Sequence, residues 1–333
     1  MERFVASCCS LVFDAIGAVT KPRLSILIFH RVHGQQDSMF PDEPDAARFD
    51  RLIHFVARSF RVMALRDAIR CMAKDEMPSR AMVITFDDGY ADNAAVALPV
   101  LLRHGVTATF FVSTGFLDGG RMWNDSVIEC LRTTPKNELD LESFGLGQCA
   151  LASLDQRRSV IGSLLPRIKY LGGAERQEAV SRLQRLCGVA DLPTDLMMTS
   201  GQLRELFKAG MEIGAHTVNH PILKNLTPSQ AEQEIQDGKH ALEDIVQGPV
   251  DTFAYPNGRP GQDYDETHVS LVRRLGFCGA VSTSPGVSRS GDDLFQLPRF
   301  TPWGRSMAAW AARLAANQRR TEYARADSTL AKN

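Results

Sequence analysis

The chain has 333 residues, of which 44% are hydrophobic and 23% charged, and its formal net charge is −1. These proportions are ordinary for a globular protein, and the length suits one domain of α/β-barrel size with an insertion. A total charge near zero implies no strong attraction to nucleic acid, so no nucleic-acid partner is expected.

The seven cysteines contain no Cys-x-x-Cys pair, and their number is odd. This pattern argues against a disulfide framework and against a zinc–thiolate site, and it favours a reducing compartment. We therefore expect a cytoplasmic location, with export or membrane association as the alternative.

Residues 1–23 are expected to form an N-terminal helical segment. The apolar run over 4–13 resembles a short signal sequence, but its positive charge is offset by Glu2 and no clean cleavage site follows it. An amphipathic helix that packs on the domain or rests on a membrane surface is the favoured interpretation, so peripheral membrane association stays open. No apolar run reaches the roughly 18 residues needed for a transmembrane span.

Buried strands and helices alternate along most of the chain, which predicts a parallel sheet covered by helices. The expected strands cover residues 24–29, a short stretch near 62, 81–86, 107–112, 211–215, 252–255, 277–282 and 297–300. The expected helices cover residues 45–60, 65–72, 91–104, 200–209, 227–246 and 264–275, with Ser200 and Thr227 as N-caps.

Two segments depart from this alternation. From about residue 120 to 199 the strand signals weaken and helical spacing dominates, so we interpret this segment as a helical insertion over or beside the site. Residues 306–333 are Ala-rich with a polar end, and we expect a helical tail that frays. The barrel itself is expected over 24–305.

The expected strand over 81–86 runs directly into Asp87 and Asp88. Two adjacent carboxylates at the end of a buried strand are costly, because desolvation and mutual repulsion both raise their pKa values. A divalent cation would relieve the cost by binding one carboxylate and leaving the other as a base. Gly89 would allow the sharp turn that this requires. The alternative is an ordinary helix N-cap.

A second candidate element is His216-x-x-x-His220, on a turn after the strand over 211–215. Two imidazoles at this spacing can reach one metal ion, and neutral histidine suits zinc, nickel or cobalt. Pro221 pushes His220 away from helical geometry, so this is not the helical zinc-protease motif. Together with one carboxylate, the two histidines form a ligand set that leaves coordination positions on the metal open for water and substrate. Iron oxygenases share that set, but on folds that do not alternate strands and helices.

A third element is the loop Tyr255-Pro256-Asn257-Gly258 at another strand end. Its proline and glycine fix the loop, and the backbone N–H of Asn257 could stabilise an oxyanion. An ordinary turn is the alternative.

Together these segments resemble the polysaccharide deacetylase family, the carbohydrate esterases that share a homology domain with the chitooligosaccharide deacetylases of nodulation. The sequence TFDDGY at 85–90 is similar to the first family motif, HTVNHP at 216–221 to the second, and FAYPNG at 253–258 to a variant of the third. The resemblance covers about 24–305. It implies an α/β fold, a distorted (β/α)7-type barrel with a helical insertion, and metal-dependent removal of N-acetyl, less often O-acetyl, groups from glycans.

The resemblance also implies roles for single residues. Asp87 would be the general base, while Asp88, His216 and His220 would bind a divalent metal, with Zn²⁺ favoured over Co²⁺ or Ni²⁺. The backbone N–H of Asn257 would help to hold the oxyanion. An N-acetylated glycan, met during exopolysaccharide or cell-envelope biosynthesis, would be the substrate.

Two positions depart from the family pattern. Many members carry an arginine where this chain has Ala254, and a late Leu-x-His where this chain ends the triplet in Arg299. We expect Arg299 to replace the missing arginine by pairing with Asp87 across the barrel. The acid that protonates the leaving group is then unassigned, and His30 after the first strand is the candidate, although a structural histidine would look the same.

Sugar contacts are expected from Tyr255, Pro256, Trp123 and Asp125. Trp123 offers a flat face for a pyranose ring, although a core tryptophan would look the same in sequence. Two other functions stay open: a same-fold hydrolase of a non-glycan amide or imide, and a glycan-binding pseudoenzyme, which the two departures would suit.

Overall fold

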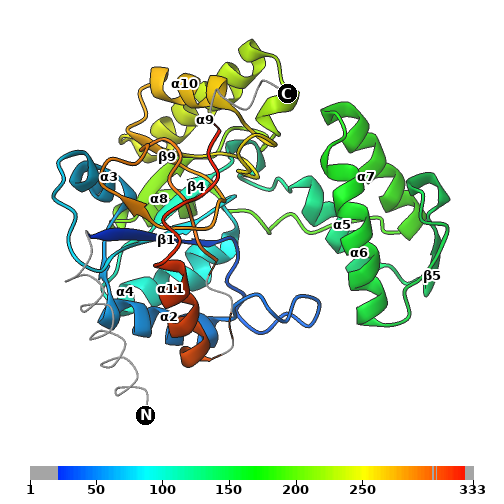
Figure 1. Ribbon diagram of the computed structural model, residues 1–333. Helices are drawn as coiled ribbons and strands as arrows, with labels where there is room; N and C mark the ends of the chain where they lie inside the picture. The colour runs from blue at the N-terminus through cyan, green and yellow to red at the C-terminus, as the bar shows by residue number, and fades with distance from the viewer. Residues whose placement is uncertain (1–21, 302–303, 305, 327–333) are drawn as a thin grey trace.

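The computed structural model describes residues 22–301, 304 and 306–326 (Figure 1). The expected helical segment over 1–23 therefore lies almost entirely outside the described residues. Within the described part, no helix is both long and apolar enough to cross a membrane.

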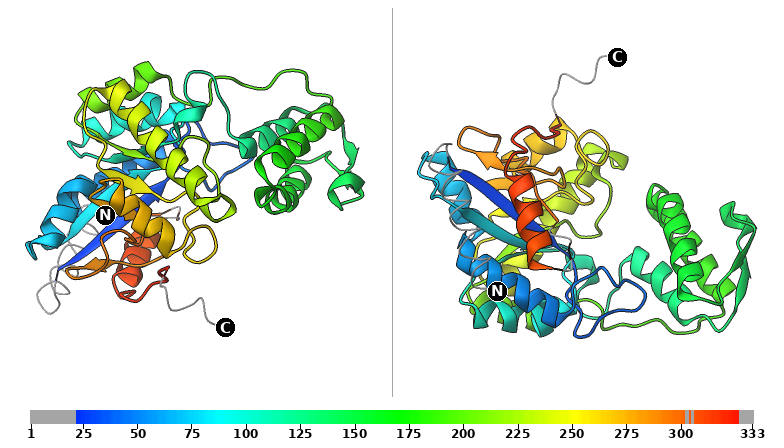
Figure 2. Two further views of the ribbon diagram at one scale, coloured as in Figure 1. Left: turned by 90° about the horizontal axis from the view of Figure 1, so that it is seen from above. Right: turned by 60° about the horizontal axis from the view of Figure 1, so that its bottom comes forward.

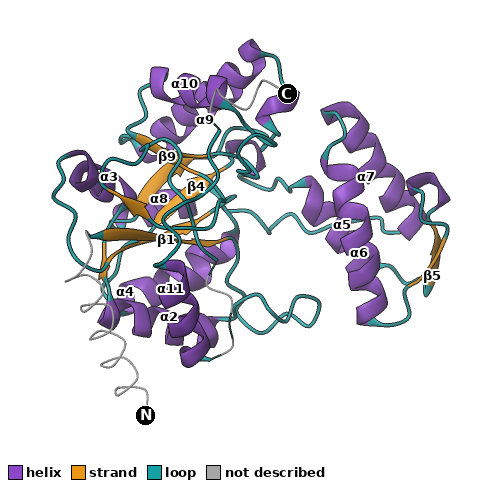
Figure 3. Cartoon of the chain, viewed as in Figure 1, coloured by secondary structure: helices purple, strands orange, loops and turns teal. Residues whose placement is uncertain are grey.

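A curled sheet forms the centre of the larger body of the molecule (Figure 3). Its strands are parallel except for β10, which pairs antiparallel with β1. The order across the sheet is β10-β1-β3-β4-β7-β8-β9, with β2 beside β3. The strands are β1 (Arg23–Phe29), β2 (Arg61–Val62), β3 (Ala81–Phe86), β4 (Thr109–Val112), β7 (Glu212–Ala215), β8 (Thr252–Ala254), β9 (Gly279–Val281) and β10 (Ser288–Arg289). β1 and β3 are the longest, and the side chains of β3 are buried on both faces, as continuous apolar runs predict.

Residues 297–300 close this sheet into a barrel. Leu297 forms a parallel bridge with β9, and Phe300 forms one with β1. The backbone N–H of Phe300 donates to the carbonyl of Ile26 at 2.8 Å. Because the closing segment joins the last strand of the series to the first, the expected distorted (β/α)7-type barrel is confirmed.

Helices cover the barrel, and their apolar faces pack against the strands in two separate clusters. They are α2 (Ala46–Ser59), α3 (Leu65–Ala73), α4 (Leu98–Arg103), α8 (Ser200–Lys208), α9 (Pro228–Val246), α10 (Glu266–Arg274) and α11 (Met307–Asn317). A π-helical turn, Asn93–Ala97, precedes α4 within the helix expected over 91–104. The expected cap of α9 at Thr227 is present, but α8 is capped by Thr199 and not by Ser200, because the Thr199 hydroxyl accepts from the Gln202 backbone N–H.

The insertion folds into a helical lobe beside the barrel (Figures 1 and 2). It contains α5 (Trp123–Thr133), α6 (Leu154–Lys169), α7 (Gly173–Cys187) and a hairpin of β5 (Glu138–Asp140) and β6 (Gln148–Ala150). The lobe buries its own apolar cluster, to which Leu131, Leu164 and Leu183 belong. The hairpin was not expected, since two three-residue strands carry no readable alternation.

The loop over 34–44 joins the lobe to the barrel. Met39 is buried in the apolar cluster of the lobe. Arg132 of α5 donates two hydrogen bonds to the Asp37 carboxylate, at 2.9 and 2.7 Å. This bidentate pair fixes the lobe against the barrel near the carboxyl ends of the strands.

The C-terminal segment is part of the barrel and not a frayed tail over its described length. α11 buries Trp310 and Leu314 in the main core. The chain then returns along the barrel, where the Ser284 hydroxyl donates to the carbonyl of Ala324 at 2.9 Å. Residues 327–333 lie outside the described part of the chain.

Candidate active site

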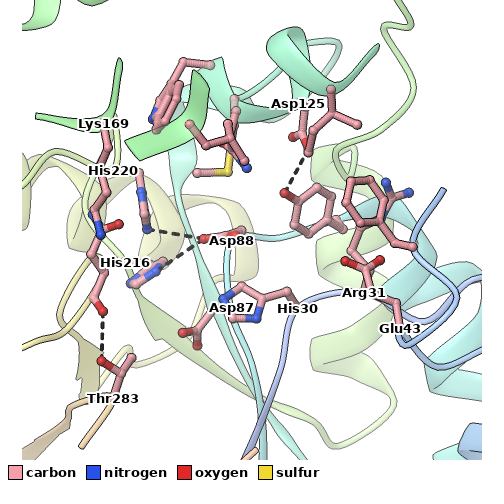
Figure 4. A pocket seen from close by; sticks show the side chains of 18 of the residues that line it. His30, Arg31, Glu43, Asp87, Asp88, Asp125, Lys169, His216, His220 and Thr283 are labelled. Carbon is pink, nitrogen blue, oxygen red and sulfur yellow. Dashed lines mark hydrogen bonds and ion pairs between the residues drawn. The ribbon is translucent and has the colours of Figure 1, made fainter. Parts of the chain in front are cut away.

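Side chains from several strand ends meet in a cavity of about 680 Å³ between the barrel and the lobe (Figure 4). Asp87 and Asp88 follow β3, and His216 follows β7. The carboxyl ends of parallel strands in a barrel lie at one face, which brings these residues together although they are distant in sequence.

The turn after β3 needs Gly89. Its φ is +93°, and a Cβ there would lie 2.8 Å from Cγ1 of Val112. Glycine is therefore the residue that this position accepts, and the tight turn allows Asp87 and Asp88 to line the same cavity.

Asp88, His216 and His220 point toward one another (Figure 4), and their ligand atoms all lie within 4.8 Å of one another. Each histidine places Nε2 at 3.4 Å from Asp88 Oδ1. That oxygen is buried and makes no hydrogen bond within the described residues. A buried carboxylate oxygen without a partner is costly. One carboxylate and two imidazoles therefore fit a divalent cation of the zinc type.

The backbone of Ala254 orients one of these histidines. His216 Nδ1 lies 2.7 Å from the Ala254 carbonyl oxygen, to which it donates. Since Nδ1 carries the proton, the lone pair of Nε2 faces Asp88 and is free to bind a metal. Ala254 stands where many family members have an arginine, and here its main-chain carbonyl orients His216.

The loop that carries His220 has a strained conformation. Thr217 and His220 have φ values of +65° and +50°, in the left-handed region. Glu234 of α9 accepts from the backbone N–H groups of Val218 and Asn219, at 3.0 and 2.8 Å, and from the Asn219 amide at 2.7 Å. The hydrogen bonds to Glu234 therefore stabilise the loop and offset the strain of its left-handed non-glycine residues. The expected non-helical turn is present.

Asp87 and Arg299 form a buried pair, with 2% and 1% of their surfaces exposed. The guanidinium donates to both carboxylate oxygens, at 2.6 and 2.7 Å, and Nε donates to the Ser282 carbonyl at 2.9 Å. The expected pairing across the barrel is therefore present. Burial alone would raise the pKa of Asp87, but the positive charge of Arg299 holds it below its ordinary value. Asp87 is thus ionised and able to accept a proton.

The two histidines have opposite pKa shifts. Burial lowers the pKa of His220 to about 4. Burial would also lower the pKa of His216, but the neighbouring carboxylates of Asp88 and Asp87 raise it above its usual value. His220 is therefore neutral at physiological pH, which is the form that binds a metal.

His30 and Asn257 also line the cavity. His30 follows β1 and is exposed to the cavity beside Asp87 (Figure 4). The Asn93 amide donates to the His30 carbonyl at 2.9 Å and so fixes that strand end. Asn257 has a φ of +60° and lines the cavity, while its carbonyl accepts from the Thr283 hydroxyl at 2.9 Å. Among the described residues, its backbone N–H has no hydrogen-bond acceptor.

Trp123 and Asp125 reach the cavity from the N-terminal turn of α5. Asp125 is 4% exposed, and its Oδ1 accepts from the Tyr90 hydroxyl at 3.1 Å. Its Oδ2 is buried without a partner in the part of the chain that the structure describes. Burial raises the pKa of Asp125 to about 7. Both residues are therefore placed where the sequence analysis expected sugar contacts.

Tyr255 and Pro256 are not placed there, and their expected sugar contacts are corrected. Both are buried and do not line the cavity. The Tyr255 ring stacks on Tyr264 with centroids 3.8 Å apart, and its hydroxyl donates to the carbonyl of Phe295 at 3.0 Å. Tyr255 and Pro256 therefore support the loop of Asn257 on the side that faces away from the cavity.

The sequence model of the family described as Polysaccharide deacetylase matches residues 74–139 and 177–280, about half of the chain. The chain belongs to the polysaccharide deacetylase family. The matched segments contain the carboxylates after β3 and the histidine loop after β7, and the unmatched interval between them falls within the lobe. A member of this family is a hydrolytic deacetylase.

Named relatives within and around the polysaccharide deacetylase family agree with this assignment. "Putative polysaccharide deacetylase YxkH" of Bacillus subtilis (strain 168) is 22% identical over 278 residues, which cover 83% of this chain and 70% of that protein. The deacetylase PplD of Streptococcus pyogenes, solved in complex with acetate, aligns with a TM-score of 0.58 at 20% identity, over 90% of this chain and 99% of that one. IcaB from Ammonifex degensii aligns with a TM-score of 0.57 at 19% identity, over 89% and 96%. These structures share the fold.

Sequence reasoning missed several residues that line the cavity of this deacetylase. Tyr90 is the last residue of the first family motif and Arg259 directly follows the third, so their positions carried a signal. Lys169 ends α6 in the lobe and Tyr170 follows it, far from any motif. Their placement depends on how the lobe packs against the barrel, and no local pattern encodes that.

Proposed function

We propose that this deacetylase is metal-dependent and removes acetyl groups, N-acetyl first, from a glycan intermediate of exopolysaccharide or cell-envelope biosynthesis. One observation carries the proposal: the Asp88, His216 and His220 cluster lies beside the buried pair of Asp87 and Arg299 in one cavity. This arrangement supplies separate groups for binding a cation and for accepting a proton.

Asp88, His216 and His220 would hold the metal, and Zn²⁺ suits this donor set. When bound, the metal would supply Lewis-acid polarisation of the acetyl carbonyl and lower the pKa of water. The partnerless Oδ1 of Asp88 and the hydrogen-bonded tautomer of His216 support this assignment.

Asp87 acts as the general base. It is ionised because Arg299 offsets the cost of burial, and the bidentate contact fixes its orientation. It accepts the proton of the attacking water, which such a positioned base promotes by roughly 10²–10⁴-fold. The free N–H of Asn257 is assigned to the oxygen that gains negative charge as the water adds.

His30 is assigned as the acid that protonates the leaving group. It faces the cavity beside Asp87, and its strand end is fixed by Asn93. An amine is a poorer leaving group than an alcohol, so amide hydrolysis depends more on an acid. Loss of His30 is therefore expected to slow release from N-acetyl substrates more than from O-acetyl substrates.

Acetate release from a panel of N- and O-acetylated oligosaccharides tests the proposal. The proteins are zinc-loaded wild type, Asp87→Asn, and Asp50→Asn as a matched control on the outer face of α2. We expect release by wild type and Asp50→Asn, and a loss of at least about 100-fold in Asp87→Asn. Equal rates in all three proteins would exclude Asp87 as the base. A parallel panel of non-glycan amides and imides tests the alternative substrate, and hydrolysis of these alone would replace the glycan as substrate.

A further inference from the structure

Two basic side chains line the cavity, one from the lobe and one from the barrel. Lys169 ends α6 of the lobe, and Arg259 belongs to the barrel loop that follows Asn257. Among the described residues, neither side chain has an ion pair or hydrogen bond, although Lys169 Nζ lies 5.4 Å from the centre of the Tyr170 ring.

Three other basic side chains of the cavity are paired with acids, in contrast to these two. The pairs are Arg31 with Asp92 at 2.8 Å, His33 with Glu43 at 2.5 Å, and Arg132 with Asp37 at 2.7 Å. Asp125 is partly neutralised, because burial raises its pKa to about 7. The wall formed by Lys169 and Arg259 therefore has an excess of positive charge.

The two cations are close enough to affect each other. Burial lowers the pKa of Lys169, the charge of Asp263 acts in the opposite direction, and the charge of Arg259 lowers the pKa further. Asp263 is itself engaged in the turn, where it accepts the backbone N–H of Arg259 at 3.0 Å. Bringing like charges together costs free energy that a bound anion would recover.

One side-chain contact joins the two segments that carry these cations. The Gln262 amide donates to the Tyr170 hydroxyl at 2.6 Å. This contact joins the end of α6 to the barrel loop, one residue from Lys169 and three from Arg259. The basic wall is thus built where the lobe meets the barrel, within the cavity that holds the metal ligands.

We propose, on the basis of the proposed function, that Lys169 and Arg259 bind an anionic group of the glycan, so that the substrate is an acetylated glycan bearing phosphate or carboxylate. A guanidinium can hold such a group with two parallel hydrogen bonds, and an ammonium adds a point charge. The simpler explanation is that Lys169 only complements the dipole of α6 and that Arg259 is solvated. That explanation predicts no preference for anionic sugars.

Binding measurements by calorimetry separate the two explanations. The probes are N-acetylglucosamine 1-phosphate, a disaccharide of glucuronate and N-acetylglucosamine, and the neutral N-acetylglucosamine disaccharide. At low salt we expect the better anionic probe to bind at least about tenfold more tightly than the neutral one, with the difference falling as salt is added. The phosphate and glucuronate arms identify which group is preferred.

The variant Lys169→Ala/Arg259→Ala should keep its affinity for the neutral probe and lose the preference for the anion. Arg167→Ala is the matched control, because Arg167 is an exposed cation on the same helix that donates to the Ser163 carbonyl at 2.8 Å. It should behave as wild type. Thermal unfolding of each variant confirms that it is folded.

Phosphate can also bind a metal directly, so each titration is made on zinc-loaded Asp87→Asn and on metal-stripped wild-type protein. A preference that persists without metal and disappears in the double variant supports the subsite. Equal affinity for anionic and neutral probes in wild type, or an unchanged preference in the double variant, overturns it. Since the metal-stripped measurement requires neither metal nor turnover, its result is independent of whether the protein deacetylates glycans.

Discussion

Replacing Arg299 with methionine would leave the Asp87 carboxylate buried without its counter-ion. Both groups are almost fully buried, and two hydrogen bonds of 2.6 and 2.7 Å join them. Removing one partner of such a pair costs about 3–5 kcal/mol, because the remaining charge is neither solvated nor paired. A loss of this size is a large part of the 5–15 kcal/mol or so that keeps a typical protein folded.

The pH dependence of this loss has a definite sign. In the wild type the pKa of Asp87 is lowered, so its contribution to stability is present above the unfolded pKa of about 3.9 and is lost as the pH falls through the folded pKa. In Arg299→Met burial would be the largest remaining influence on the pKa of Asp87, and it raises that pKa, while His216 and His30 offset only part of it. The variant is then penalised at neutral pH, and the penalty disappears as the pH falls through the raised pKa. The difference in the free energy of unfolding between wild type and Arg299→Met should therefore become smaller toward pH 4.

Urea unfolding of metal-stripped protein at pH 7, followed by circular dichroism, measures the effect in a double-mutant cycle. Asp87→Asn removes the charge that Arg299 balances, so Arg299→Met should cost less than about 1 kcal/mol in that background. Similar costs in both backgrounds would refute the pairing as the source of stability. The acid limb of the rate profile should also move to higher pH in Arg299→Met, since the base would titrate later.

Three further predictions concern the same site. Glu234→Gln should weaken zinc affinity about 10–100-fold in chelator competition while the Tm changes little, because Glu234 holds the loop of His220; unchanged affinity would contradict this. Asp125→Asn, which can keep the Tyr90 hydrogen bond, should raise KM several-fold with kcat nearly constant, and a fall in kcat alone would oppose a binding role. The logarithm of the zinc affinity should rise with pH with a slope near one between pH 5 and 6. His216 must lose a proton to bind the metal, whereas His220, with a pKa of about 4, is already neutral. A slope of two would contradict this.

The sequence predicted the barrel because its strands are buried on both faces and therefore appear as continuous apolar runs. The run over 81–86 gave β3 at its observed bounds, and the carboxylates after it were placed correctly at a strand end. The pairing of Arg299 with Asp87 was also predicted, since an absent arginine at Ala254 left the base without a partner.

Other features depended on tertiary contacts that local patterns do not encode. The placement of Lys169 in the cavity requires the lobe to be fixed to the barrel, which Arg132 and Asp37 achieve across 95 residues of sequence. Tyr255 was misplaced because β8 ends at Ala254 and the chain then leaves strand geometry, with a φ of +60° at Asn257, so strand alternation does not predict which side chains of this loop reach the cavity. Its ring packs outward on Tyr264, while the cavity receives Asn257.

The most direct test of the account is reconstitution of metal-stripped protein with zinc, with bound metal and acetate release measured on the same samples. We expect release from an N-acetylated glycan to rise in proportion to bound zinc up to one ion per chain, and His220→Ala to abolish both binding and release. Asp87→Asn should bind one zinc ion and release no acetate, because it keeps the cation ligands and lacks the base. Full activity in the metal-stripped protein, or wild-type release by zinc-loaded Asp87→Asn, would contradict the account.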